Sequence, residues 1–336
     1  MQEPGLQPVY DVVTLGETML RLTPPNLKRL EQTQSLDIEV GGSESNTAVG
    51  LARLGLKVAW LSRMTDNPLG RLIARTIAGH GVDTSYVTWT DQDRIGLYFL
   101  EEGRAPRGSS IIYDRANSAA SRIQPTDLPS ELFTAGKARL LHLTGITPAL
   151  GPQAAATTRH AIKLAKEAGW LFSFDLNYRS RLWATLAARE GCEPLAAAAD
   201  LLIAPLGDTR LLYNLSPECT PVEALAELSR RFPRATVVLT LGKQGAIGCE
   251  PQGKIVRQSV FRAEEVGRIG GGDAFAAGLL YGYLLNQPDR LATALRWGAA
   301  VAALKYSIPG DLPVIDKAEA IALVEQGDRI RARLTR

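Results

Sequence analysis

The sequence predicts an α/β protein with a large, mostly parallel sheet and helices on both of its faces. Three observations support this fold class. Short aliphatic runs alternate with helix-length segments over most of the chain. Most of these runs end in polar or glycine residues, as parallel strands do beside a ligand cleft. Two strand-like segments, roughly residues 18–41 and 94–120, interrupt the alternation and are expected to form a small antiparallel β-sheet lid.

The length allows one large α/β domain or two smaller ones. Because the sequence shows no domain linker, a single α/β domain covering residues 1–336 is expected. The chain is 45% hydrophobic and 22% charged, with a formal net charge of +3, which is typical of a soluble globular protein. Because the net charge is small and the basic residues are scattered, a nucleic-acid partner is not expected. The basic tail Arg329–Arg333 is interpreted as a solvated end.

The sequence also indicates a protein with no membrane partner and a cytoplasmic location. No apolar run approaches the roughly 20 residues that span a bilayer, and the N-terminus carries Glu3 and early prolines where a basic and apolar leader would be. The cysteines, Cys192, Cys219 and Cys249, lie far apart and are odd in number, as expected of reduced thiols.

In the first part of the chain, Val12–Leu15 is a predicted buried strand that ends at Gly16 and Glu17. A glycine-rich segment, residues 41–46, leads into a predicted helix at 47–55. Helix-like spacing recurs at 69–80. The remaining predicted strands are Lys57–Leu61, Leu97–Leu100, Ile111–Tyr113, Leu140–Leu143, Leu171–Phe174, Leu201–Ala204 and Val237–Leu241. The remaining predicted helices are Pro152–Ala168, Pro221–Phe232, Ala274–Leu285, Arg290–Lys305 and Lys317–Glu325.

The strongest local signal is the stretch Gly270, Gly271, Gly272 and Asp273 before the apolar helix. Glycines have no Cβ, so their N–H groups can converge on one anion, and the positive end of the helix faces the same point. A phosphate would bind there. A carboxylate beside a phosphate suits a general base that accepts a proton from the attacking group, so Asp273 is predicted to be that base. The alternative is that Asp273 is a helix cap.

Familiar nucleotide and hydrolase motifs do not occur. The chain has no GxxxxGK[ST] loop, no GxGxxG between a strand and a helix, no HExxH and no GxSxG. His80, His142 and His160 are therefore expected to be surface or packing residues.

Two separate motifs resemble the ribokinase-like (PfkB) carbohydrate kinase family. They are Gly270 to Phe275, which resembles the C-terminal signature, and Gly41 to Asn46 with Gly55, which resembles the N-terminal one. The resemblance covers nearly the whole chain and implies a ribokinase-like fold with a β lid. It also implies that Asp273 takes the proton from a sugar hydroxyl while Gly270, Gly271 and Gly272 form the anion hole.

Within the family, the chain looks most similar to 2-keto-3-deoxygluconate kinases. The resemblance rests on Gly16 to Thr18, Leu143 to Pro148, Asp175 to Arg179 and Ile308 to Asp311, with Tyr113, Asp114 and Arg115. It implies an ATP-dependent kinase that phosphorylates the terminal hydroxyl of this sugar acid. The residues implied to contact the sugar acid are Gly42, Asn46, Tyr98, Tyr113, Arg115, Arg179 and Asp311. Two arginines suit a carboxylate because guanidinium groups bind carboxylates bidentately.

ATP and Mg²⁺ are the cofactors that the resemblance implies. The residues implied to lie near the nucleotide are Asn177, Asp208, Thr240, Gly242 and Gly245. Asp208 is the predicted contact for Mg²⁺, through water, because phosphoryl transfer needs charge neutralisation between the β and γ phosphates.

The chain departs from the family pattern at three places. Pro205 and Asp208 stand where an Asn-x-x-Glu motif is usual, Thr65 stands where glycine is usual, and Gly267 replaces an aspartate. The glycine gives no support for the monovalent cation site that some relatives build there.

Two alternative functions and one possible mode of self-association stay open. The chain could be a kinase of another sugar, fructose or 5-keto-2-deoxygluconate, or a sugar-acid or nucleotide binding protein with weakened catalysis. Exposed lid strands could also pair two copies into a homo-oligomer.

Overall fold

The computed structural model describes residues 8–327, and the basic tail Arg329–Arg333 and Glu3 lie outside the described residues. The main sheet has the strand order β14-β13-β12-β11-β10-β9-β1-β4-β5, with β6 also paired to β4. Its strands are β1 (Tyr10–Leu15), β4 (Val58–Thr65), β5 (Val82–Asp83), β6 (Val87–Thr90), β9 (Ala138–Thr144), β10 (Leu171–Asp175), β11 (Leu201–Pro205), β12 (Thr236–Thr240), β13 (Ala246–Cys249) and β14 (Ile255–Gln258). The strands are parallel except at one edge, where β13 is antiparallel to both β12 and β14.

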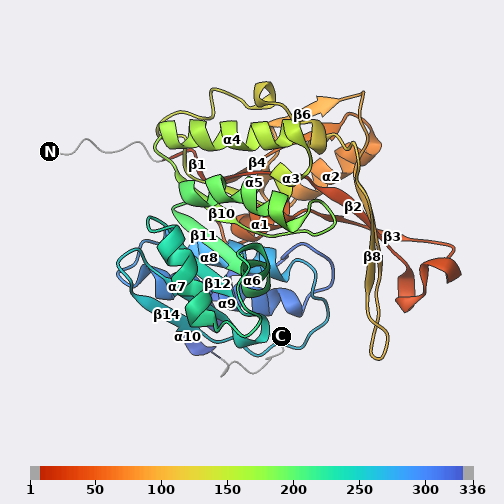
Figure 1. The fold of residues 1–336 in the computed structure, drawn as a ribbon. Coiled ribbons are helices and arrows are strands. Elements are labelled where there is room, and N and C mark those ends of the chain that lie inside the picture. Colours follow the sequence, from red (N-terminus) through yellow and green to blue (C-terminus); the bar gives the residue numbers. More distant parts are fainter. Residues whose placement is uncertain (1–7, 328–336) are drawn as a thin grey trace.

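Helices cover both faces of this sheet (Figure 1). They are α1 (Ser43–Arg53), α2 (Pro68–Ala78), α3 (Ile146–Ala149), α4 (Pro152–Glu167), α5 (Thr185–Ala198), α6 (Leu206–Leu212), α7 (Pro221–Arg231), α8 (Gly271–Leu284), α9 (Arg290–Tyr306) and α10 (Lys317–Gln326). Short 3₁₀ helices occur at Pro25–Leu27, Leu30–Gln32, Ala120–Arg122, Pro125–Asp127 and Gly242–Gln244. The predicted fold class, an α/β protein with a large, mostly parallel sheet and a small second sheet, is confirmed.

The strands are apolar on both faces because both faces are covered. On β1, Val12 packs into the core beneath α1, α2, α8, α9 and α10, whereas Val13 packs into the core beneath α4, α5, α6 and α7. On β12, Val238 and Val237 divide between the same two cores. Continuous aliphatic runs are therefore what a sheet between two helical layers requires.

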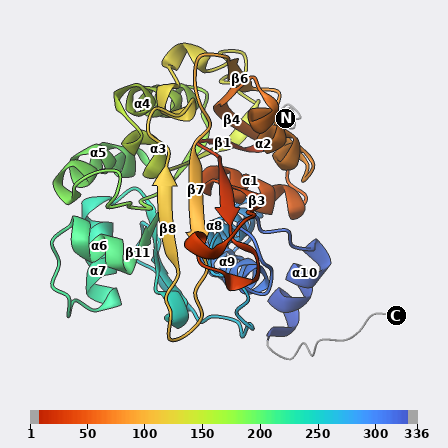
Figure 2. The same ribbon diagram turned by 90° about the vertical axis from the view of Figure 1, so that its right-hand side faces the viewer.

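The small sheet has the order β3-β2-β7-β8 and stands at one side of the main sheet (Figures 1 and 2). Its strands are β2 (Met19–Thr23), β3 (Asp37–Gly41), β7 (Leu97–Glu101) and β8 (Ser110–Asp114). The expectation of a purely antiparallel lid was wrong, because β2 and β7 pair in parallel. These two strands come from separate segments of the chain, so no hairpin forces them to run in opposite directions.

The edges of the small sheet carry apolar side chains. Ile38 on β3 and Ile112 on β8 are each 54% exposed. Pairing of two copies through this sheet stays a prediction.

Two helices begin earlier than the sequence indicated, and this changes the site. Helix α1 starts at Ser43 and not at residue 47, so Asn46 lies in its first turn. Helix α8 starts at Gly271 and not at Ala274. In both cases glycine and polar residues lowered the helix propensity, and packing of α1 against α8 outweighed it. The sequence also did not reveal α5, α6 or the antiparallel edge of β13 and β14.

Within the described part of the chain, none of the helices combines the length and the apolar character that a membrane crossing requires.

Candidate active site

The first turn of α8 presents an open helix N-terminus at the centre of the molecule. Gly270 precedes the helix with φ of +77°, and a Cβ at this position would lie 2.0 Å from the carbonyl oxygen of Asp311. Only glycine fits both demands. Gly271 and Gly272 were predicted to lie before the helix with Gly270. In the structure they are the first two residues of the helix. The first N–H groups of a helix have no partner within it, so this end can bind an anion.

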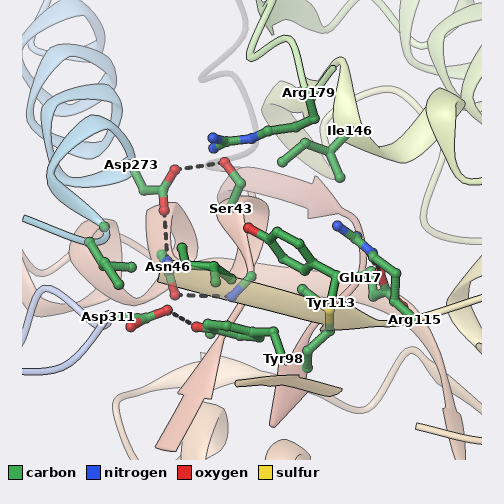
Figure 3. Close-up of a pocket in the computed structure, with 16 residues that line it drawn as sticks. Glu17, Ser43, Asn46, Tyr98, Tyr113, Arg115, Ile146, Arg179, Asp273 and Asp311 are labelled. Atoms are coloured by element: carbon green, nitrogen blue, oxygen red, sulfur yellow. Dashed lines mark hydrogen bonds and ion pairs between the residues drawn. The ribbon is translucent and has the colours of Figure 1, made fainter. Parts of the chain in front are cut away.

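Asp273 lies in this first turn, and its side chain reaches across to α1. Its Oδ1 accepts a hydrogen bond from the Ser43 hydroxyl (2.7 Å) and its Oδ2 accepts one from the Asn46 side-chain amide (2.7 Å; Figure 3). Helix α8 has no side-chain cap hydrogen bond, so the alternative that Asp273 caps this helix was wrong.

The donors around Asp273 are themselves held in place. The Gly42 N–H donates to Asn46 Oδ1 (3.3 Å), which orients the Asn46 amide so that its nitrogen faces Asp273. The Asn177 amide donates to the Ser43 hydroxyl oxygen (2.9 Å). Asn177 thus lies one hydrogen bond behind Ser43, so the residue predicted on the nucleotide side is linked to the predicted base.

Burial raises the pKa of Asp273 above its usual range. The hydrogen bonds from Ser43 and Asn46, and the positive charges of Arg179 and Lys305, oppose that rise. A general base works best when its pKa is close to the working pH. The surroundings of Asp273 move its pKa in that direction.

A cavity opens in front of Asp273, between the small sheet and the first turns of α1 and α8. Nine of the predicted catalytic or substrate residues line it: Gly42, Asn46, Tyr98, Tyr113, Arg115, Arg179, Gly270, Asp273 and Asp311. The other lining residues are Glu17, Met19, Gly41, Ser43, Ile111, Ile146 and Ile269. Gly271 and Gly272 and the five predicted nucleotide residues do not line this cavity.

Arg179 follows β10 and points toward Asp273 and Ser43 (Figure 3). Among the described residues, its guanidinium makes no ion pair with a carboxylate, although its charge acts on Asp175, Asp208 and Asp273. An unpaired guanidinium at the wall of a cavity is available to an anionic ligand.

Arg115 lies elsewhere along the cavity, and its charge is already neutralised. Its guanidinium pairs with Glu17, through Nε at 2.8 Å and through Nη2. The hydroxyl of Ser118 donates to the other oxygen of Glu17. Both predicted arginines therefore line one cavity. Within residues 8–327, Arg115 has an ion-pair partner and Arg179 has none.

Asp311 is buried, and both of its oxygens have protein partners. Oδ1 accepts from Arg21 and Oδ2 accepts from the Tyr98 hydroxyl. Arg21 also pairs with Glu39. The resemblance implied that Asp311 binds a substrate hydroxyl, and the structure shows that it joins the small sheet to the loop that follows α9.

Glu17, Arg21 and Ser43 were missed as site residues. Ser43 lies inside the N-terminal motif and could have been found there. Glu17 lies at the end of a predicted strand, but its pairing with Arg115, 98 residues away, gave no local signal. The pairing of Arg21 with Asp311, 290 residues away, gave none either.

Asp175, at the end of β10, and Asp208 are two further carboxylates near Asp273. Burial, together with the charges of Asp273 and Asp208, raises the pKa of Asp175 to about 8. Burial also raises the pKa of Asp208, whose Oδ2 accepts from the Tyr178 N–H (3.0 Å). Asp208 lies in the first turn of α6, and Pro205 is the N-cap residue of that helix.

The predicted nucleotide loop follows β12. Gly242 and Gly245 have φ of +58° and +90°, and a Cβ at Gly245 would lie 2.0 Å from the Gln258 carbonyl oxygen. Glycines therefore shape this turn, and nucleotide binding by it and by Thr240 stays a prediction. Within residues 8–327 there is no group of three or more His, Cys, Asp or Glu side chains that could hold a metal ion. The contact of Asp208 with Mg²⁺ through water stays a prediction.

Comparison with known proteins agrees with this fold. The model of the pfkB family of carbohydrate kinases matches residues 10–317. The chain is 41% identical to a 2-dehydro-3-deoxygalactonokinase of Haloferax volcanii, over 95% of this chain and 98% of that one. It is 32% identical to a 2-dehydro-3-deoxygluconokinase of Bacillus subtilis, over 93% and 94% of the two chains.

Among solved structures, the 2-dehydro-3-deoxygluconokinase of Thermotoga maritima superposes with a TM-score of 0.84 at 36% identity, over 95% of this chain and 99% of that one. The fold and these matches define a phosphotransferase that acts on an alcohol group. The chain belongs to the pfkB family of carbohydrate kinases.

Proposed function

We propose that this protein is an ATP-dependent kinase that phosphorylates the terminal hydroxyl of a 2-keto-3-deoxy sugar acid, with 2-keto-3-deoxygluconate as the leading substrate. The observation that carries the proposal is that Asp273 and the unpaired Arg179 face the same cavity. One side chain can accept a proton, and the other can bind a carboxylate. A neutral sugar would leave the Arg179 charge without a partner.

In the proposed reaction, the sugar hydroxyl oxygen attacks the γ phosphorus of ATP. The new O–P bond forms as the bond between γ phosphorus and the β–γ bridging oxygen breaks, and ADP leaves. Asp273 accepts the hydroxyl proton, while Ser43 and Asn46 hold its carboxylate in position. The backbone N–H groups in the first turn of α8 bind the charge of the transferring group.

Mg²⁺ supplies the charge neutralisation between the phosphates of ATP. Asp208 is the residue proposed to hold it through water, and Thr240, Gly242 and Gly245 are proposed to contact the nucleotide. Asn177, bonded to Ser43, connects this region to the base.

The 2-dehydro-3-deoxygalactonokinase of Haloferax volcanii and the 2-dehydro-3-deoxygluconokinase of Bacillus subtilis are named for acids that differ in the configuration of one carbon. The residues of this cavity that carry charge do not select between the two, because Arg179 would bind the carboxylate that both acids share.

A coupled assay of ADP release over both epimers, 5-keto-2-deoxygluconate, fructose and ribose tests the proposal. We expect turnover on one or both 2-keto-3-deoxy acids, and none in an Asp273→Ala variant. Good turnover on fructose with none on any acid would reject the sugar-acid assignment. Ligand-induced thermal stabilisation without phosphorylated product would instead support the alternative of a binding protein.

A further inference from the structure

Lys305 on α9 is a buried lysine that the proposed reaction does not use. Its side chain is 0% exposed, although lysine is almost never fully buried unless it is paired. Its Nζ donates a hydrogen bond to the carbonyl oxygen of Ile308 (2.9 Å), and among the described residues it forms no ion pair. The ammonium group is therefore coordinated by backbone oxygen and not neutralised by a neighbouring carboxylate.

The carbonyl that Lys305 holds belongs to the loop 306–311, which packs against the segment 266–271. The N–H groups of Val266 and Gly267 donate to the Tyr306 carbonyl oxygen (2.8 and 3.3 Å). A Cβ on Gly271 would lie 2.6 Å from the Tyr306 ring. The loop that Lys305 bonds to is thus in direct contact with the N-terminus of α8.

The charge of Lys305 also acts on the reaction site. Burial lowers the pKa of Lys305, the negative charges of Asp311, Glu39 and Asp273 oppose this change, and the positive charge of Arg21 adds to it. In turn, the charge of Lys305 lowers the pKa of Asp273. The ammonium group thus favours the ionised form of the predicted base.

We propose that the Lys305 ammonium group is a built-in replacement for a bound monovalent cation, so that this kinase needs no added K⁺. It is a positioning residue: it ties the loop 306–311 to the helix that carries it and places one fixed positive charge behind the anion-binding turn. A carbonyl-coordinated ammonium resembles K⁺ in charge and size. Position 267 fits this reading, because a Cβ there would lie 3.6 Å from the Ile308 carbonyl oxygen, yet glycine supplies no carboxylate to hold a free cation.

The inference rests on the kinase class of the protein and not on the identity of the sugar acid. It is tested by replacing Lys305 with alanine, which leaves a space next to the carbonyl oxygen of Ile308, and with methionine, which fills most of that space. The control is Lys317→Ala, an exposed lysine at the start of α10. Melting temperature, binding of Mg·ADP and kcat are measured in choline, sodium, potassium and ammonium chloride at equal ionic strength.

We expect the wild-type protein and Lys317→Ala to be indifferent to the cation. Lys305→Ala should lose at least about tenfold in kcat in choline chloride, about 1.4 kcal/mol in the barrier. Potassium or ammonium chloride should restore much of that loss and raise the melting temperature. Lys305→Met should show the loss without the rescue.

The proposal is overturned if the wild-type protein requires potassium, or if Lys305→Ala turns over at the wild-type rate in choline chloride. It is also overturned if Lys305→Ala is destabilised and no cation restores it, which would show a purely structural role. If the alanine variant does not fold, the cation response of the wild-type protein and of Lys305→Met decides. Failure of the sugar-acid assignment would appear separately, as wild-type protein that binds Mg·ADP but turns over none of the acids.

Discussion

The two sides of the cavity differ in whether their charged side chains form ion pairs. On the side of the small sheet, the charged groups are paired: Arg115 with Glu17, and Arg21 with both Asp311 and Glu39. On the side of the main sheet, Asp273 and Arg179 line the same cavity, and neither belongs to an ion pair among the described residues.

This difference separates groups that build the cavity from groups that can act on a ligand. A buried ion pair is costly to break but has little net charge to offer a substrate. A carboxylate held by two neutral donors, as Asp273 is, keeps the capacity to accept a proton. The lid-side pairs therefore fix geometry, whereas the sheet-side groups are the ones available for chemistry and binding.

The largest effect is expected at the base. Asp273→Asn should bind Mg·ATP like the wild-type protein but lose roughly 10²- to 10⁴-fold in kcat, the usual contribution of general-base catalysis. Steady-state kinetics on the best sugar acid and calorimetric titration with nucleotide measure the two quantities. Asp316→Asn, a change at the N-cap of α10, is the matched control and should leave kcat unchanged. Equal kcat in Asp273→Asn and wild type would remove the base from this position.

The next effect should appear in stability. Arg115→Met leaves the Glu17 carboxylate, whose side chain is 1% exposed, without its cation. Removing one partner of a buried ion pair costs about 3–5 kcal/mol. The free energy of unfolding, measured by denaturant titration, should therefore fall by about that amount. The double variant Arg115→Met with Glu17→Gln should recover much of it. Unchanged stability in the single variant would mean that the lid-side pair is not structural.

Arg179→Met should give the opposite pattern, with unchanged stability and weaker binding. Loss of a hydrogen-bonded charge partner costs about 1.5–3 kcal/mol, or roughly 10- to 150-fold in KM for an acid substrate. KM for a neutral sugar should not rise. Arg189→Met, which removes a half-buried arginine on α5, outside the cavity, is the control. If Arg179→Met leaves KM for acids unchanged, the substrate carboxylate binds elsewhere.

The smallest expected effect is a change in how the stability of the protein depends on pH. The pKa of Asp175 is about 8 in the folded protein and 3.8 as its ordinary value, so above pH 4 the unfolded chain ionises this group while the folded chain keeps its proton. Asp175 thus costs stability that grows as pH rises from about 4 to about 8. Asp175→Asn should raise the melting temperature more at pH 8 than at pH 5. An equal shift at both values would show that Asp175 is ionised in the folded state.

Much of the fold could be predicted because its signals are local. The aliphatic run at Val12 and the periodic helix at residues 152–168 specify elements through neighbouring side chains alone. The parallel pairing of β2 with β7 could not be predicted, since it depends on how two separate segments meet. The early start of α1 also escaped prediction, because packing against α8 outweighed the low helix propensity of its first residues.

By itself, the sequence determined the order of most strands and helices, the glycine turn at Gly270 and the position of Asp273 at a helix start, because each depends on residues close together in the chain. Only the tertiary structure decided which charges are paired. Arg115 and Arg179 look equivalent in the sequence, yet Glu17 neutralises one and leaves the other free of an ion pair within the described residues. Electrostatic pairing depends on distance in space, and residues 98 or 290 positions apart acquire that distance only when the chain folds.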